Sequence, residues 1–88
     1  MTEIVFSRDF ASHFKKLPTP VQSKTDNLID LLSVDYRDSR LHTKKLHGEN
    51  NLYSFRASYD YRIIFKFIDS QKIYLLDIKH RKDVYRNL

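Results

Sequence analysis

The stretch LYSFRASYDYRIIFKF, residues 52–67, carries the pattern that decides the fold. Apolar and polar residues alternate along it, with a short interruption near Tyr59. Its apolar positions are Tyr53, Phe55, Ala57, Tyr61, Ile63, Phe65 and Phe67. A period of two is typical of β-strands that bury one face. If the chain turns near Tyr59, Phe55 pairs with Ile63 and the apolar side chains share one face. The stretch therefore predicts an antiparallel hairpin.

A third strand is predicted to follow this hairpin after a turn at residues 69–71. Tyr74, Leu76 and Ile78 alternate there with other residues and are expected on the apolar face. A turn at residues 70–71 pairs Phe65 with Leu76. The three strands then form a meander with one strongly apolar face, which needs a covering layer.

Two helices are predicted upstream and would supply that layer. Residues 4–6 read as a first strand, and Ser7 can cap a helix that ends before Pro18. The run Thr19-Pro20-Val21-Gln22 reads as a capping box that starts a second helix, with Thr19 at the N-cap. Helices joined by so short a break form an antiparallel hairpin. The predicted fold is α+β, in the order β-α-α-β-β-β, as a single domain over residues 1–88.

Composition narrows the classes of function. The 88 residues contain no Cys, which excludes a disulfide scaffold and Cys-ligated zinc. The 16 Lys and Arg exceed the 11 Asp and Glu, and the net charge of +5 favours polyanionic partners. No apolar stretch approaches a membrane span, and the first residues do not resemble a signal peptide. We expect a cytoplasmic protein that is not embedded in a membrane.

Cations gather on the other face of the predicted sheet. The hairpin register puts Arg56 opposite Arg62, and the third strand brings Lys79 and then Arg81 to the same end. Like charges directly opposite each other destabilise a sheet, by up to about 1 kcal/mol per pair. Such a row can be a solvated face with scattered ion pairs, to which Asp60 and Asp77 would contribute, or a site for an anion.

The residues that follow these cations suit the cleavage of RNA by its own 2′-hydroxyl. That reaction needs a base, positive charge on the phosphorane and an acid for the leaving oxygen. A histidine such as His80 can take or give a proton at neutral pH, arginine binds phosphate through two hydrogen bonds, and Tyr85 can stack on a base or act in proton transfer. The alternative is that His80 and Tyr85 are packing or surface residues. His42 and His47 lack companion ligands at a metal-site spacing, so we expect no metal.

Four runs along the chain resemble the RelE/ParE superfamily of toxins from type II toxin–antitoxin systems. They are the segment at residues 14–24 that contains Leu17, Pro18, Val21 and Gln22, then LHTKKLHG at 41–48, LYSFRASYDYRIIFKF at 52–67 and IKHRKDVYR at 78–86. The β-α-α-β-β-β order agrees with the fold of that family. RelE-like members resemble ribonucleases that cut mRNA in the ribosomal A site, whereas ParE-like members inhibit DNA gyrase. The ending of this chain is more similar to the RelE side.

The resemblance implies a ribosome-dependent endoribonuclease that works by 2′-hydroxyl attack without a metal or other cofactor. Arg56 and Arg62 would contact the phosphate and the transition state. Arg81 would be a further cation or act on the acid side, and Tyr85 would stack on or orient the nucleotide. Some members carry lysines where this chain has Ser54 and Arg56, and one of those lysines serves in proton transfer. Arginine is a poor base, so the candidate for the general base in this chain is His80. The lysines assigned to RNA or ribosome contact are Lys44, Lys45, Lys66, Lys79 and Lys82.

The same resemblance implies an acidic antitoxin, the ribosome and mRNA as partners. Two other functions stay open: a ParE-like gyrase inhibitor without ribonuclease activity, and a basic RNA- or ribosome-binding module without any activity.

Overall fold

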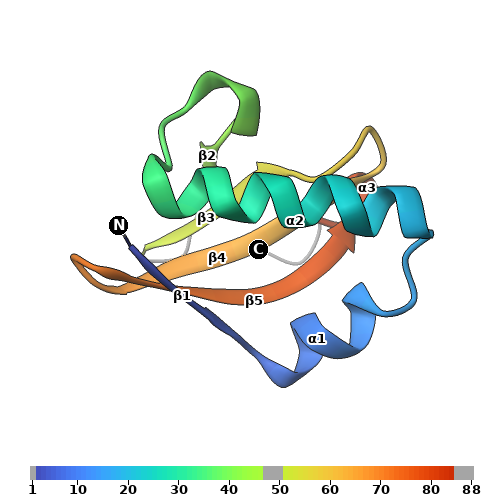
Figure 1. Ribbon diagram of the computed structural model, residues 1–88, viewed down its shortest axis with the longest axis horizontal. Coiled ribbons are helices and arrows are strands. Elements are labelled where there is room, and N and C mark those ends of the chain that lie inside the picture. Colours follow the sequence, from blue (N-terminus) through green and yellow to red (C-terminus); the bar gives the residue numbers. More distant parts are fainter. Residues whose placement is uncertain (1, 47–50, 85–88) are drawn as a thin grey trace.

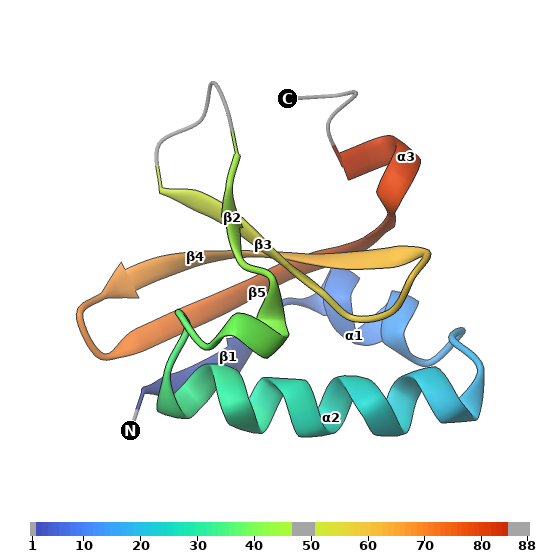
Figure 2. The same cartoon turned by 90° about the horizontal axis from the view of Figure 1, so that it is seen from above.

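Five strands form one sheet in the computed structural model, which describes residues 2–46 and 51–84 (Figure 1). The elements in chain order are β1 (Glu3–Phe6), α1 (Arg8–Phe14), α2 (Thr19–Val34), the 3-10 helix η1 (Ser39–Leu41), β2 (Lys44–Lys45), β3 (Leu52–Arg56), β4 (Tyr61–Asp69), β5 (Lys72–His80) and α3 (Arg81–Val84). Their order across the sheet is β1-β5-β4-β3-β2, with β1 parallel to β5 and the other pairs antiparallel. Figure 2 shows α1 and α2 on one side of the sheet and α3 on the other. The predicted α+β class is confirmed.

The β3–β4 hairpin has the register that the sequence predicts. Phe55 pairs with Ile63, and Arg56 lies opposite Arg62. The chain reverses through residues 57–60, where the Ala57 amide donates to the Tyr61 carbonyl at 3.0 Å. The apolar alternation of this hairpin was therefore enough to set which side chains share a face.

The β4–β5 pairing contains a bulge that the sequence did not reveal. Ile63 pairs with Ile78 as predicted, but Phe65 pairs with Leu75, so the predicted partner Leu76 is skipped. The extra residue reverses the alternation, and the core receives Ile73 and Leu75 before the bulge and Ile78 after it. The prediction that Tyr74 and Leu76 lie in the main core is wrong for this reason.

Ser7 joins the bulge to the start of α1. Its hydroxyl donates to the Leu76 carbonyl at 2.6 Å and accepts from the Phe10 amide at 2.9 Å. The predicted cap is thus confirmed, and the same side chain also satisfies a carbonyl at the irregular part of β5. This places α1 against β5.

The start of α2 differs from the predicted capping box. Pro18 is the N-cap residue, and no side chain makes a capping hydrogen bond there. Gln22 instead donates through Nε2 to the carbonyls of Leu17 at 2.9 Å and Lys15 at 3.2 Å. The last carbonyls of a helix need donors, and the turn after α1 brings them within reach of Gln22.

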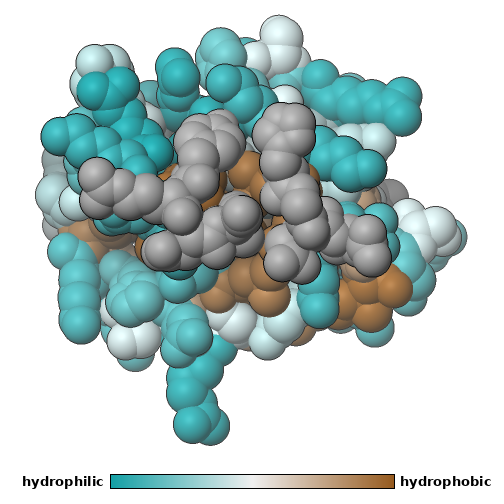
Figure 3. All heavy atoms as spheres, turned by 180° about the vertical axis from the view of Figure 1, so that it is seen from behind, coloured by the Kyte–Doolittle hydropathy of each residue, from teal (hydrophilic) through white to brown (hydrophobic). Residues whose placement is uncertain are grey.

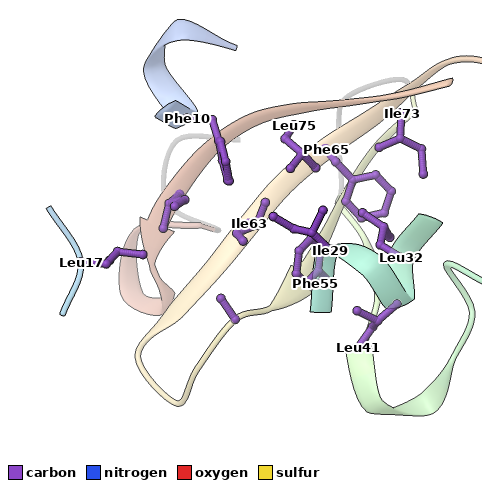
Figure 4. Packing of buried hydrophobic residues seen from close by; sticks show 12 residues of the cluster. Phe10, Leu17, Ile29, Leu32, Leu41, Phe55, Ile63, Phe65, Ile73 and Leu75 are labelled. Carbon is purple, nitrogen blue, oxygen red and sulfur yellow. The ribbon is translucent and has the colours of Figure 1, made fainter. Parts of the chain in front are cut away.

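The main core lies between the helices and the sheet (Figure 4). Its buried members are Phe10, Leu17, Ile29, Leu32, Leu41, Phe55, Ala57, Ile63, Phe65, Ile73, Leu75 and Ile78. Aromatic side chains contact one another in and beside this core, where Phe65 stacks on the partly buried Tyr53 with ring centroids 5.5 Å apart. Within the described ranges, no helix has the length and apolar character to cross a bilayer.

A smaller cluster occupies the opposite face. Leu46, Ile64 and Val84 are buried there, beside the partly buried Leu52 and Leu76. Val84 belongs to α3, and Leu46 directly follows β2, so these two short elements cover part of this face. They leave room at one end of β3 and β4 for polar and charged side chains.

Candidate functional site

Five cations line one pocket of about 310 Å³ on the face opposite α1 and α2. They are Lys44, Arg56, Arg62, Arg81 and Lys82. Figure 3, which views the molecule from behind, shows hydrophilic side chains around the edges of the molecule and hydrophobic ones between them. We call this cavity the cationic pocket.

Three separate segments bring these cations together. The β3–β4 register places Arg56 opposite Arg62, and β2 adds Lys44 because Lys44 pairs with Ser54 of β3. The Arg81 amide donates to the Asp60 carbonyl at 2.7 Å, so α3 begins beside the β3–β4 turn. Sequence reasoning predicted that Arg56, Arg62, Lys79 and Arg81 converge. The structure brings the three arginines together, but Lys79 is not among the residues that line this pocket.

Arg62 is buried and held by several acceptors. Only 3% of the residue is exposed. Its Nε donates to Ser54 Oγ at 2.8 Å, and its Nη2 donates to the His42 carbonyl at 2.5 Å. His42 adopts a left-handed backbone conformation with φ of 50°, which directs its carbonyl inward. Arg62 therefore fixes the segment before β2 against the sheet, and its guanidinium has a defined place in the pocket.

The other four cations of the pocket are exposed. Among the described residues, none of Lys44, Arg56, Arg81 and Lys82 forms an ion pair with a carboxylate. Asp77, which the sequence suggested as a compensating charge, accepts instead from His13 Nδ1 at 2.5 Å. Because unpaired like charges repel one another, the pocket is suited to an anionic group.

His80 lies outside the cationic pocket. It is the last residue of β5, pairs with Tyr61, and meets the Tyr61 ring edge-on with centroids 5.8 Å apart. Its Nδ1 accepts from the Lys82 amide at 3.1 Å, which satisfies a donor at the start of α3. The predicted role of His80 as a base stays a prediction, and His80 is not among the residues that line the cationic pocket.

A second pocket of about 430 Å³ contains His80 and has mixed charge. Its lining residues are His13, Lys16, Leu17, Tyr61, Asp77, Ile78, Lys79, His80 and Asp83. Lys79 lies opposite Arg62 in the β4–β5 register, as predicted, yet it lines this second pocket. The paired His13 and Asp77 are 64 residues apart, and no sequence spacing signals their contact.

The remaining predicted residues are dispersed. Lys45 lines a separate pocket of about 340 Å³ beside Tyr36 and Tyr53. Lys66 is exposed further along β4, with its Nζ 5.9 Å from the centre of the Tyr74 ring. Tyr85 lies outside the described residues, and its predicted stacking role stays a prediction.

Two residues near the cationic pocket were missed by sequence reasoning. Ser54 is completely buried and accepts from Arg62, and its polar character on an alternating strand was the available signal. Tyr59 is an exposed aromatic residue in the β3–β4 turn, and its ring contacts Arg81. No group of three or more His, Asp or Glu side chains in the described ranges is arranged to hold a metal ion.

Comparison with known proteins establishes the family. Residues 4–85 match the model described as the ParE toxin of the type II toxin–antitoxin system parDE. The chain belongs to this toxin family. Among curated protein sequences, none matches this toxin chain.

Solved structures share this fold at low sequence identity. The toxin resembles the RelE–RelB complex of Pyrococcus horikoshii OT3, with 21% identity and a TM-score of 0.77, over 91% of this chain and 94% of that one. The RelB–RelE complex of Methanococcus jannaschii has 23% identity and a TM-score of 0.76, over 96% and 98%. The YoeB/ParE toxin of Agrobacterium tumefaciens has 13% identity and a TM-score of 0.78, over 91% and 99%.

Proposed function

We propose that this toxin is an endoribonuclease that cuts mRNA in the ribosomal A site, without a metal or other cofactor. The observation that carries the proposal is the cationic pocket, in which four exposed cations and one buried arginine surround a single cavity. A phosphodiester is the abundant anion that such a pocket would meet in a complex with mRNA. The same proposal includes an acidic antitoxin, the ribosome and mRNA as partners, and a cytoplasmic location.

The chemistry is an internal displacement at phosphorus. The 2′-hydroxyl oxygen bonds to the adjacent phosphorus, the bond to the 5′-oxygen breaks, and the products are a 2′,3′-cyclic phosphate and a 5′-hydroxyl. One proton leaves the 2′-hydroxyl and one reaches the 5′-oxygen. Negative charge grows on the non-bridging oxygens, where Arg56 and Arg81 would donate hydrogen bonds. Arg62 would add a guanidinium that its buried partners already hold in place.

The reaction also needs a group that accepts the proton from the 2′-hydroxyl. His80 is the predicted base, but it lines the second pocket and its Nδ1 accepts from a backbone amide. If His80 is the base, His80→Ala removes the acidic limb of the pH–rate profile. If the profile keeps its shape, His80 serves only to begin α3, and the cations accelerate the reaction without it.

The test is primer extension across a defined mRNA on ribosomes stalled with an open A site. Wild-type protein is compared with Arg56→Ala, which removes an exposed cation of the pocket, and with Lys24→Ala, which removes an exposed cation of α2 on the other side of the sheet. We expect cuts at the A-site codon from the wild type and from Lys24→Ala, and at least a tenfold loss for Arg56→Ala. Equal cutting by all three proteins, or no cutting by folded wild type, would contradict the proposal.

Gyrase inhibition is the second candidate, because the family that matches the chain is described as ParE. It requires no nucleophilic chemistry, so the cationic pocket would serve only to bind. A supercoiling assay with purified gyrase separates the two functions. Inhibition of supercoiling together with intact mRNA on ribosomes would replace the ribonuclease proposal.

A further inference from the structure

Tyr59 places an aromatic ring beside the cationic pocket. It lies in the β3–β4 turn, and 69% of the residue is exposed. The guanidinium carbon of Arg81 is 4.3 Å from the centre of its ring, within the range of a cation–π contact. Since Arg81 also lines the cationic pocket, one side chain connects the pocket to the ring.

We propose that Tyr59 is a stacking platform for an RNA base whose phosphate occupies the cationic pocket. This inference deepens the proposed ribonuclease function and rests on it. Every base has a flat π-face, and proteins that bind single-stranded RNA stack such faces on aromatic rings and arginine planes. Arg81 would contact the phosphate with its donors and support the ring with its plane.

The exposure of Tyr59 favours a role in ligand binding over a structural role for this residue. The ring is not needed to place Arg81, because the Arg81 amide is already fixed by the Asp60 carbonyl at 2.7 Å. Arg81 covers only part of the ring, and more than two thirds of the residue meets solvent. The ring therefore has free surface next to five cations, which is the combination that single-stranded RNA requires.

Stacking on Tyr59 would be tolerant of sequence. The described contacts around the ring supply no second polar group that could read the edge of a base, and stacking depends on the face alone. Tyr59 would thus contribute to affinity and to the orientation of the nucleotide. It would give little preference among codons.

The first experiment uses the absence of tryptophan from the chain. Tyr59→Trp introduces a single tryptophan whose fluorescence reports directly on the platform. The probe is a short single-stranded RNA with non-cleavable 2′-methoxy groups, compared with an abasic strand of the same sugar–phosphate backbone. We expect the base-bearing strand to quench the fluorescence and the abasic strand to leave it nearly unchanged. Equal quenching by both strands would overturn the inference.

A variant series supplies the second measurement. Tyr59→Phe keeps the ring and should bind the base-bearing strand like wild type, whereas Tyr59→Leu keeps apolar bulk without a π-face and should bind about tenfold more weakly. Binding of the abasic strand should be the same for all three proteins, and circular dichroism verifies that each is folded. If Tyr59→Leu binds the base-bearing strand as tightly as wild type, the inference is wrong.

The two proposals fail in distinguishable ways. Normal ribosomal cleavage by Tyr59→Leu, with unchanged RNA affinity, would remove the platform and leave the ribonuclease function intact. Base-dependent quenching in Tyr59→Trp, from a protein that never cuts mRNA on ribosomes, would support the platform and contradict the ribonuclease function.

Discussion

The two faces of the sheet are built from alternate residues of the same strands, yet their environments differ. The face under α1 and α2 buries a continuous cluster of aliphatic and aromatic side chains. Among the described residues, the opposite face buries Leu46, Ile64 and Val84, and beside them the polar pair Ser54 and Arg62. Ile63 and Ile64 are consecutive in β4, yet Ile63 lies in the main core and Ile64 in the smaller cluster of the opposite face. Adjacent positions in a strand can therefore serve stability and charge clustering without conflict.

The opposite face can hold clustered cations because only part of it is covered. A fully covered face would require each charge to lose its water, at a cost of several kcal/mol per ion. Here Arg62 alone is buried, and backbone and hydroxyl acceptors surround it. The four other cations of the cationic pocket stay at the surface and keep their hydration until an anion replaces it.

The largest expected effect is on the covered face. Phe65→Ala should lower the free energy of unfolding by about 3–5 kcal/mol, because it deletes a fully buried ring that contacts three other aromatic residues. Ile64→Ala, one position away on the opposite face, should cost near the lower end of about 2–5 kcal/mol, since its cluster is small. Urea denaturation measures both. Equal losses would show that the two faces contribute alike.

A smaller difference in stability is expected between variants of the two arginines that lie opposite each other in β3 and β4. Arg62→Met removes the donors to Ser54 Oγ and to the His42 carbonyl and should cost about 1–3 kcal/mol of stability. Arg56→Met changes an exposed side chain and should stay within about 0.5 kcal/mol. Thermal unfolding of the two variants compares them. Similar midpoints would mean that the Arg62 hydrogen bonds contribute little.

The smallest effect concerns a region that belongs to neither face. The guanidinium of Arg40 and its backbone amide both donate to Asp38 and lower the pKa of that carboxyl from 3.8 to about 2. The folded-state pKa is below the unfolded one, so this contact stabilises the protein above about pH 4 and is lost as the pH falls to 2. Arg40→Ala should raise the pKa of Asp38 part of the way to 3.8, since the backbone amide still donates. An NMR titration of the Asp38 carboxyl carbon measures this, and an unchanged pKa would contradict the assigned cause.

Local periodicity was sufficient for the parts of the fold that repeat. The alternation in residues 52–67 gave the correct β3–β4 register, and that register was enough to place Arg56 opposite Arg62. It could not reveal the skipped Leu76, because the apolar run at residues 73–76 fits either phase of the strand. The true phase follows from contacts with β1 and α1, such as the hydrogen bond from Ser7 to the Leu76 carbonyl.

Prediction of the candidate site was limited by contacts between distant segments. Arg56, Arg62 and Arg81 could be placed together because hairpin register relates them. The Arg62 contact with the His42 carbonyl depends on the left-handed backbone of His42 in an irregular loop. No sequence pattern predicted that conformation. Tyr59 was overlooked because a tyrosine in a turn has no periodic neighbours.

The bulge at Leu76 has a consequence for how such toxins diverge. Deleting Leu76 would let Leu75, Asp77 and Ile78 alternate regularly, so Ile78 and His80 would keep the faces they now occupy. The bulge is therefore a place in β5 where one codon can be gained or lost without exchanging the side chains offered to the two pockets. Alignments that put the gap elsewhere in β5 would equate residues that occupy opposite faces of the molecule.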